Sequence, residues 1–445
     1  MKTGRYFGTD GFRGRAGDTL RAEHAYKIGL FLGGYFAGEK GRKCRVVIGK
    51  DTRRSSYMLE SSLVSGLTSA GADAYIMHVT TTASVSYITR TDGFDCGIMI
   101  SASHNGFEDN GIKLIGAGGE KMDEDVIARL ENFLDGIEGE YPVVSGRDIG
   151  ASHDYVCGRN RYTGHLIALS ACSFKGIKVG LDCADGSAWQ IAKAVFDALG
   201  AKTYVTGCSP DGFNINRSGS TRPEVLCAMV RENGLDCGFA FDGDADRCIA
   251  ADEFGNIVDG DGELYILSRR LKQLGELNDC GIVATVMSNS GLTESLSSCG
   301  IPTHITKVGD RFVYKMMCEK GAQLGGEKSG HIIISKYGAS GDGLVTAIKL
   351  LEAAAERGTT LSALLKGYKS LPQVQLSVRV RDKISPFEGG RLPSFAERQR
   401  EKFGCARVNV RPSGTEQVIR IMAEGENEEN CRRCVAEIAR YLNDM

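Results

Sequence analysis

The feature that most constrains the fold is a pattern of strand, polar loop, helix, glycine and strand that occurs three times. Each unit opens and closes with a short apolar run, and the pairs of runs are Arg45–Gly49 and Ala74–Met77, Ile177–Leu181 and Thr203–Val205, and Gly281–Val286 and His304–Ile305. A glycine follows each helical stretch, namely Gly71, Gly200 and Gly300. This order of elements is typical of a right-handed βαβ crossover. We therefore expect three similar α/β units.

Each unit is followed by a further apolar run that ends in a polar loop. The first two of these runs begin with the same Asp-Cys-Gly, at Asp95 and Asp236. The loops are Ser101–Asn105, Asp242–Arg247 and Gly325–His331. Ligand sites in open α/β sheets lie at the carboxyl ends of strands, so these loops are candidates for the chemistry.

The pattern changes after Lys366. Alternating or short apolar runs predict strands at Val374–Val380, Val408–Val410 and Val418–Met422, and helical periodicity covers Leu392–Phe403 and Asn427–Leu442. We expect a fourth, smaller α+β domain here.

The predicted fold class is α/β, with three similar α/β mixed-sheet domains plus a smaller C-terminal α+β domain around a central cleft. The predicted domains are 1–150 with the Ser103 loop, 151–255 with the aspartate loop, 256–369 with the Glu327–His331 loop, and 370–445 with the Arg411–Glu416 loop. The Gly-rich and charged stretch Gly136–Gly150 is the best candidate for a linker.

Composition excludes several classes of protein. The chain of 445 residues has 54 Lys+Arg against 56 Asp+Glu, which argues against a nucleic-acid or membrane-surface partner. No run approaches the length of a membrane span, and Met1–Asp10 has no apolar core of a signal peptide. The 15 cysteines are scattered through apolar runs, which favours reduced, buried thiols in the cytoplasm.

The loop with three alternating aspartates is the strongest metal candidate. Asp242, Asp244 and Asp246 can direct their carboxylates to one point through a turn, and three such oxygens suit Mg²⁺. A phosphatase-like Asp-x-Asp site is the alternative from the residues alone, and it would make Asp242 the phosphorylated group.

Ser103 and its neighbour His104 follow a buried strand. A serine hydroxyl is a poor nucleophile without help, and no Gly-x-Ser-x-Gly elbow surrounds this one. A phosphorylated Ser103 would carry about two negative charges and could supply a fourth hard ligand to a metal held by the three aspartates.

Two further loops carry binding groups. Arg411–Glu416 combines a guanidinium, the hydroxyls of Ser413 and Thr415, and the flexible Gly414, which are the parts of a phosphate cradle, and Arg420 could add a second guanidinium. In the other loop, Glu327 and Ser329 could read sugar hydroxyls, and His331 could act as a general acid or base.

Taken together and in order, five segments resemble the α-D-phosphohexomutase superfamily and, within it, the bacterial phosphoglucosamine mutases. They are Gly8–Gly14, Ser101–Asn105, Asp242–Arg247, Gly326–His331 and Arg411–Glu416. The resemblance extends from about residue 4 to residue 440.

The resemblance implies a role for each candidate residue. Ser103 matches the phosphoserine, and with Asp242, Asp244 and Asp246 it would hold Mg²⁺. Lys113 and His331 match positions of proton transfer, His104 lies beside the serine, and Arg13 and Arg247 match basic groups that face the transferred phosphate. Glu327 and Ser329 match the sugar-hydroxyl readers, and Arg411, Ser413, Gly414, Thr415 and Arg420 match the loop that holds the other phosphate.

The implied activity is that of an isomerase that interconverts glucosamine 6-phosphate and glucosamine 1-phosphate through a phosphoserine and a bisphosphorylated sugar. A sugar 1,6-bisphosphate would serve as primer, the partner would be a small phosphosugar, and the protein would be a monomer or homodimer. Phosphomannomutase/phosphoglucomutase activity and a non-catalytic sugar-phosphate binding protein are the alternatives.

The sequence departs from the family pattern at a few positions. Gly106, Ala245 and Gln417 replace Pro, Gly and Pro, which changes backbone stiffness and leaves every chemical group in place. Lys328 stands where the phosphoglucosamine mutases usually carry Gln, so it places a cation beside the sugar-reading loop.

Overall fold

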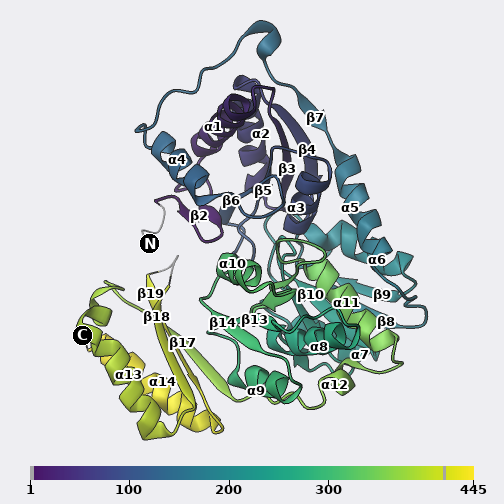
Figure 1. The fold of residues 1–445 in the computed structure, drawn as a ribbon, viewed down its shortest axis with the longest axis vertical. Coiled ribbons are helices and arrows are strands. Elements are labelled where there is room, and N and C mark those ends of the chain that lie inside the picture. Colours follow the sequence, from purple (N-terminus) through teal and green to yellow (C-terminus); the bar gives the residue numbers. More distant parts are fainter. Residues whose placement is uncertain (1–4, 414–416, 445) are drawn as a thin grey trace. The chain divides into compact units, whose positions relative to one another are not determined.

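The computed structural model of the chain describes residues 5–413 and 417–444. It separates into two compact units, one formed by Met1–Ser288 with Cys299–Lys366 and one formed by Asn289–Ser298 with Gly367–Met445 (Figure 1). In the described residues, the first unit contains three β-sheets and the second contains one. No helix in these described ranges combines the length and the apolar character that crossing a membrane requires.

The first sheet has the strand order β1-β2-β6-β5-β3-β4-β7. Its elements in chain order are β1 (Phe7–Gly8), β2 (Gly11–Arg15), α1 (Ala22–Lys40), β3 (Arg45–Lys50), α2 (Arg54–Ser69), β4 (Asp73–Val79), α3 (Thr82–Thr91), β5 (Cys96–Ile100), β6 (Asp109–Ile115), α4 (Glu124–Leu134), the 3₁₀ turn Gly146–Asp148 and β7 (Ser152–Asp154). Strand β7 lies beyond the boundary predicted near residue 150 and pairs in parallel with β4.

The second sheet has the order β12-β11-β10-β8-β9. Its elements are α5 (Val156–Ala168), β8 (Lys178–Asp182), the 3₁₀ turn Ser187–Gln190, α6 (Ile191–Ala198), β9 (Lys202–Thr206), α7 (Glu224–Asn233), β10 (Cys237–Phe241), β11 (Cys248–Ala251) and β12 (Ile257–Val258).

The third sheet has the order β14-β13-β15-β16. The chain passes in turn through α8 (Gly260–Gln273), β13 (Ile282–Thr285), α9 (Ser290–Ser298), β14 (Thr303–Thr306), α10 (Asp310–Lys320), β15 (Leu324–Gly326), β16 (Ile332–Ile334), α11 (Gly343–Ala355) and α12 (Leu361–Leu364). Helix α9 belongs to the second unit.

The three sheets share one core arrangement, which confirms the predicted repeat. In each, the first strand pairs in parallel with the next strand of its βαβ unit and with the strand before the polar loop: β3 with β4 and β5, β8 with β9 and β10, and β13 with β14 and β15. The strand after the loop returns antiparallel, as β6, β11 and β16. The prediction did not include this returning strand as a common element.

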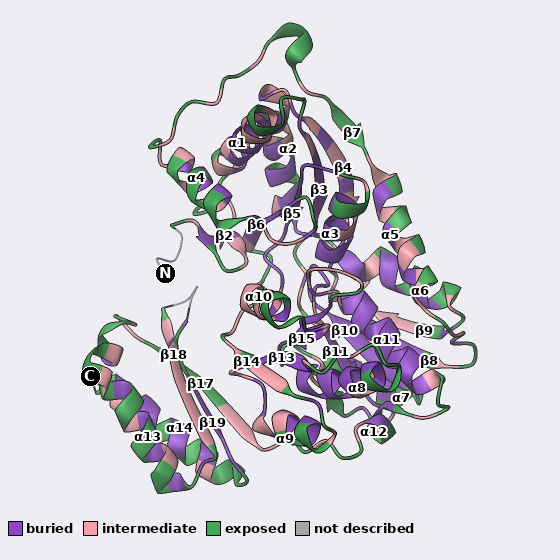
Figure 2. Ribbon diagram, in the orientation of Figure 1, coloured by how far each residue is buried: buried purple, intermediate pink, exposed green. Residues whose placement is uncertain are grey.

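Helices cover both faces of the first sheet, which explains why the middle residues of its central strands β3 and β5 are apolar (Figure 2). Val46 and Ile48 of β3 pack in the cluster that contains α1 and α2, whereas Val47 packs with Val85 and Ile88 of α3 on the other face. Successive side chains of a strand point to opposite faces, so a strand buried on both sides needs no polar positions.

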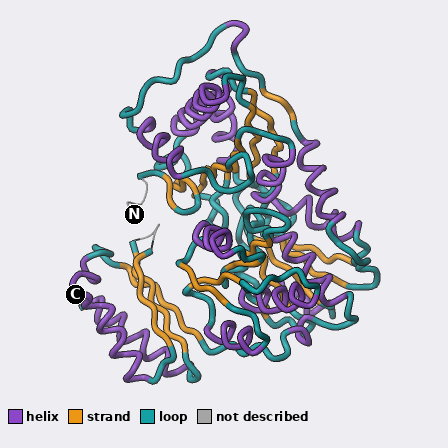
Figure 3. The backbone as a smooth tube through the Cα atoms, in the orientation of Figure 1, coloured by secondary structure: helices purple, strands orange, loops and turns teal. Residues whose placement is uncertain are grey.

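The second unit is a three-stranded antiparallel sheet with two helices on one face (Figure 3). It consists of β17 (Gln373–Arg379), the 3₁₀ segment Ser385–Gly390, α13 (Arg391–Phe403), β18 (Arg407–Pro412), β19 (Val418–Glu424) and α14 (Glu428–Asn443) in addition to α9. Its core joins the buried faces of α13 and α14 to Ile419, Ile421 and Ala423 of β19. The predicted elements of this region are confirmed within one or two residues.

Helix α9 is tied to this unit by side chains at its start. Asn289 pairs with both the N–H and the carbonyl of Leu371, at 3.0 and 2.8 Å. The backbone N–H and hydroxyl of Ser290 donate to the buried carboxylate of Glu424. The sequence pattern assigned α9 only to the third repeat.

The close approach of α1 and α2 depends on two glycines. A Cβ at Gly66 would lie 2.0 Å from the carbonyl oxygen of Tyr26, and one at Gly29 would lie 2.4 Å from that of Leu63. Both obstacles are helix backbone, which cannot turn aside.

We therefore expect Gly66→Ala to destabilise the first unit by about 1–3 kcal/mol, because the helices must separate. Urea unfolding followed by far-UV circular dichroism measures this change. Gly38→Ala in α1 is the matched control, because nothing lies within 4 Å of its Cβ position; it should stabilise the helix by up to about 1 kcal/mol. An unchanged midpoint for Gly66→Ala would contradict the tight packing.

Candidate active site

The three polar loops occupy the same place in their sheets. Each connects the last parallel strand of its repeat to the returning antiparallel strand, between β5 and β6, β10 and β11, and β15 and β16. Since the loops follow the carboxyl ends of parallel strands, the fold itself presents them as sites.

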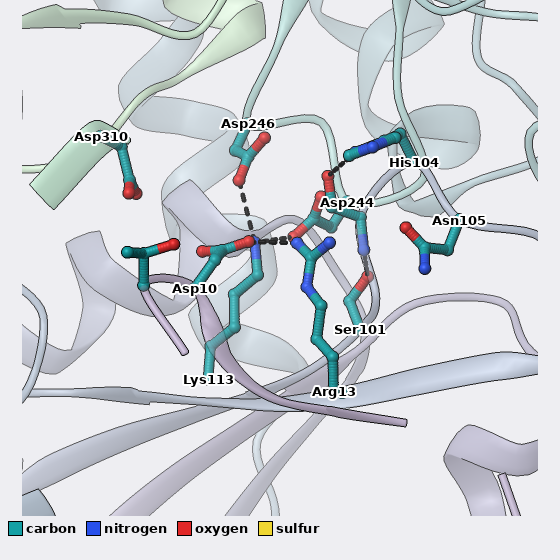
Figure 4. Close-up of polar contacts among 12 residues, drawn as sticks. Asp10, Arg13, Ser101, His104, Asn105, Lys113, Asp244, Asp246 and Asp310 are labelled. Atoms are coloured by element: carbon teal, nitrogen blue, oxygen red, sulfur yellow. Dashed lines mark hydrogen bonds and ion pairs between the residues drawn. The ribbon is translucent and has the colours of Figure 1, made fainter. Parts of the chain in front are cut away.

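Ser103 and Asp242 come together from two different repeats. The Ser103 hydroxyl is buried and donates to Asp242 Oδ2 at 2.5 Å. The Nδ1 atom of His104 lies 3.4 Å from the same hydroxyl oxygen (Figure 4). Burial, followed by the charges of Arg247 and Arg13, lowers the pKa of His104 to about 3, so its ring is neutral. Because the Ser103 hydroxyl gives its proton to Asp242, Nδ1 faces that oxygen as an N–H donor.

The three aspartates form a buried cluster. Asp242, Asp244 and Asp246 each offer a carboxylate oxygen, and these oxygens all lie within 4.8 Å of one another. Burial, then the charges of Asp246 and Asp244, raise the pKa of Asp242 to about 7. Oδ1 of Asp244 and Oδ1 of Asp246 are buried and accept no hydrogen bond from the residues the structure describes. Hard oxygen ligands with unused lone pairs fit a small divalent cation such as Mg²⁺.

Lys113 on β6 joins this cluster from the first repeat. Its Nζ donates to Asp244 at 2.7 Å and to Asp246 at 2.9 Å, and it lies 3.3 Å from Asp10 (Figure 4). Burial alone would lower the pKa of this ammonium, but the three carboxylates outweigh burial and raise it well above the usual value. Lys113 is therefore held as a cation.

Two arginines stand at the edge of the cluster. Arg13 on β2 forms an ion pair with Asp10, and Arg247 Nε lies 3.8 Å from Asp246 Oδ1. The Nε atoms of Arg13 and Arg247 are buried and donate to no described residue. A site with such donors is suited to an anion.

His331 reaches the cluster from the third repeat. Its Nδ1 lies 3.6 Å from Asp246 Oδ1, and its Nε2 lies 3.8 Å from Asp310 Oδ2. Burial lowers the pKa of His331, but Asp246, Asp310 and Glu327 outweigh it and raise the pKa to about 9. The Gly341 N–H donates to Nε2 at 3.1 Å, which needs a neutral ring. In the arrangement shown, the proton therefore lies on Nδ1, and a charged ring has to turn from Gly341 toward Asp310.

The other residues of this loop differ in exposure. Glu327 is buried and accepts a hydrogen bond from Gly309 N at 2.8 Å, whereas Ser329 is exposed. Lys328 Nζ lies 3.6 Å from Asp259 Oδ2, so an acidic neighbour offsets its charge.

The predicted phosphate-binding residues lie in the second unit. Arg411 on β18 and Arg420 on β19 are directly opposite each other in the antiparallel pair, so both side chains project from the same face of the sheet. Ser413 is buried, and Lys383 Nζ donates to its carbonyl at 2.8 Å. Gly414 and Thr415 lie outside the described residues.

Sequence reasoning missed three charged residues of the first unit that contact the predicted ones. Lys121 donates to Asp10 at 3.0 Å and to Asp310 at 2.7 Å and so connects the surroundings of Lys113 and His331. Asp10 shares a seven-residue motif with Arg13, and this proximity was the signal that could have identified it. Asp310 lies in Lys307–Arg311, a stretch that the family resemblance also covers, whereas Lys121 stands in a segment without a recognised motif.

Comparison with protein families matches the four parts of the chain to four domain models of phosphoglucomutase/phosphomannomutase. The alpha/beta/alpha domain I model matches residues 4–140, domain II matches 160–255, domain III matches 259–371, and the C-terminal domain matches 355–441.

Curated relatives match over nearly their full length. The phosphoglucosamine mutase of Lachnospira eligens is 53% identical over 98% of this chain and 97% of its own. That of Bacillus subtilis is 44% identical over 99% of this chain and 98% of its own.

Solved structures agree in fold. A phosphoglucomutase/phosphomannomutase family protein from Burkholderia thailandensis has a TM-score of 0.78 at 23% identity, covering 98% of this chain and 97% of that one. An Aspergillus fumigatus N-acetylphosphoglucosamine mutase, solved with GlcNAc-6P and magnesium, has a TM-score of 0.68 at 18% identity over 99% of this chain and 95% of that one. Because family models cover nearly the whole length and relatives reach 53% identity, the chain belongs to the phosphoglucomutase/phosphomannomutase family.

Proposed function

We propose that the chain interconverts glucosamine 6-phosphate and glucosamine 1-phosphate with Ser103 as the phosphoryl carrier. The observation that carries this proposal is the buried Ser103 hydroxyl placed 2.5 Å from Asp242, at the edge of a cluster of carboxylates and arginines. The curated relatives named phosphoglucosamine mutase support the choice of reaction.

Asp242, Asp244 and Asp246 would hold Mg²⁺ together with a phosphate oxygen on Ser103. When bound, such a cation supplies neutralisation of the charge on the phosphoryl group. Arg13 and Arg247 face the same group and supply further positive charge, which is the main demand of phosphoryl transfer.

The transfer forms a bond between phosphorus and a sugar hydroxyl oxygen and breaks the bond between phosphorus and Ser103 Oγ. The hydroxyl gives up its proton, and Ser103 Oγ takes one. We assign these exchanges to Lys113, which is held as an ammonium that can donate, and to His331, which can accept a proton in the neutral form that receives the Gly341 N–H bond at Nε2. His104, neutral and 3.4 Å from the Ser103 hydroxyl, orients it.

The sugar bisphosphate formed by this step would turn over and return its other phosphate to Ser103. Glu327 and Ser329 would read the sugar hydroxyls, and Arg411, Ser413, Gly414, Thr415 and Arg420 would hold the phosphate that does not react. A sugar 1,6-bisphosphate is needed as primer, because an unmodified Ser103 has no phosphoryl group to give.

We place the protein in the cytoplasm as a monomer or homodimer. All fifteen cysteines are free, in keeping with a reducing compartment.

Ser103→Ala should lower kcat at least about 10³-fold, because it removes the proposed carrier of the phosphoryl group. A coupled assay with Mg²⁺ and the bisphosphate primer measures this loss. Intact mass after incubation with the primer should show an added phosphoryl group on the wild type and none on the variant. Ser61→Ala, at an exposed serine of α2, is the matched control and should keep full activity. Normal turnover by Ser103→Ala would refute the phosphoserine mechanism.

Mg²⁺ should raise the thermal unfolding midpoint, because it binds the native carboxylate cluster and not the unfolded chain. In Asp242→Asn the Mg²⁺-dependent rise should largely disappear, whereas the exposed Asp18→Asn should respond like the wild type. Thermal shift measured with Mg²⁺ and with EDTA gives both results. An equal response from Asp242→Asn would place the cation elsewhere.

The preferred substrate should be the glucosamine phosphate. We expect its kcat/KM to exceed those of the glucose and mannose phosphates, and Lys328→Gln to change it less than about threefold, because Asp259 already offsets the lysine charge. Kinetics on the three sugar phosphates measure the preference. A higher kcat/KM on the mannose or glucose phosphate would assign phosphomannomutase/phosphoglucomutase activity instead.

A further inference from the structure

The backbone of Ser103 has an unfavourable conformation. Its φ is +50°, in the left-handed region that residues with a Cβ rarely adopt because the Cβ approaches the following carbonyl oxygen. The residue lies in the loop after β5, where no strand ladder fixes its peptide groups. Contacts from side chains must therefore hold it.

The N–H side of Ser103 is fixed within the first repeat. Ser103 N donates to Ser101 Oγ at 2.9 Å, and Ser101 Oγ donates to Asp51 Oδ2 at 2.6 Å. Asp51 also accepts from the backbone N–H of Arg53 and from the hydroxyl of Ser56.

The carbonyl side of Ser103 is held by two donors from different repeats. Arg53 Nη2 donates to Ser103 O at 3.1 Å and to Asn105 O at 2.6 Å. Asn216 Nδ2, from the loop between β9 and α7, donates to the same two oxygens at 2.7 and 2.9 Å. The carbonyls of Ser103 and Asn105 thus each accept one hydrogen bond from Arg53 and one from Asn216.

The charge of Arg53 is already neutralised in this arrangement. The Arg53 side chain is fully buried and forms an ion pair with Asp51. Its other hydrogen bonds go to Ser101 Oγ and to backbone carbonyls of the loop. This geometry distinguishes Arg53 from Arg13 and Arg247, whose Nε atoms remain available to an anion.

The second repeat also meets the loop through its backbone. A Cβ at Gly243 would lie 2.6 Å from Ser103 O and 2.9 Å from Asn216 Nδ2, so only a glycine allows the aspartate loop to pack here. The Ser103 carbonyl is therefore enclosed by Arg53, Asn216 and Gly243.

We propose that Arg53 and Asn216 are positioning residues for phosphoryl transfer, which fix the left-handed Ser103 by holding its carbonyl and that of Asn105. This inference rests on the proposed function of Ser103. With the carbonyl fixed, the Cα–Cβ bond has one direction, and the hydroxyl oxygen faces Asp242. A misplacement of the reacting oxygen by about 1 Å costs about 100-fold in rate.

Asn216 is the residue to test, because replacement of the fully buried Arg53 would also leave Asp51 unpaired in the core. Asn216 itself has a φ of +61°, so Asn216→Gly removes both donors and keeps the backbone conformation. Asn216→Asp keeps the shape and tolerates the same φ, but its carboxylate cannot donate and repels the two carbonyls.

We expect both variants to lose about 10- to 100-fold in kcat while KM for the sugar phosphate changes less than about twofold. The thermal midpoint should stay near that of the wild type. His78→Gly is the matched control, because His78 is another left-handed residue, partly exposed on β4, and its Nε2 lies 3.4 Å from Asp154 on the neighbouring strand β7. This control should keep the wild-type kcat.

The outcomes separate this proposal from the proposed function. An active wild type with equal kcat in Asn216→Gly and Asn216→Asp would overturn the positioning role alone. A loss of activity that merely follows a lowered thermal midpoint, or that raises KM instead of lowering kcat, would also overturn it. A wild type with no mutase activity in the presence of primer and Mg²⁺ would overturn the proposed function and this inference with it.

Discussion

The contact between the Ser103 hydroxyl and Asp242 is the interaction on which the rest of the site depends. It joins residues 139 positions apart, at 2.5 Å, in a fully buried environment. Such a contact requires the loops at the strand ends of two sheets to meet, and the backbone there has room only for glycine at residue 243. Lys113 and Thr82 add hydrogen bonds from the first repeat to Asp244, so the same junction also fixes the carboxylate cluster.

Much of the fold could be predicted because its signals are local. Apolar runs, terminal glycines and the repeated Asp-Cys-Gly reflect strand burial and helix ends, which depend on neighbours in sequence. The grouping of α9 with the C-terminal sheet could not be predicted this way. It results from the bonds of Asn289 to Leu371 and of Ser290 to Glu424, and no local pattern records which partner a polar side chain will find.

The residues of the candidate site also fall into those with a local sequence signal and those defined by remote partners. Ser103 and the three aspartates stand in motifs whose residue types already suggest chemistry, and the structure brings them together. Asp51, Arg53 and Asn216 looked like ordinary polar loop residues, because their contacts are made to backbone carbonyls and to another repeat. Lys121 and Asp310 were missed for a similar reason, because the oppositely charged partners of each are remote in the chain.

The common position of the three loops has a consequence for how such a protein can evolve. Each polar loop is attached to its own sheet. Two duplications of one ancestral α/β segment would therefore have produced three loops at equivalent positions. The residues of each loop could then change independently, to carry a reactive serine, to bind a cation or to contact a sugar. The sheet and its helices would stay the same. The shared connection order β5–β6, β10–β11 and β15–β16 is the trace that such duplication would leave.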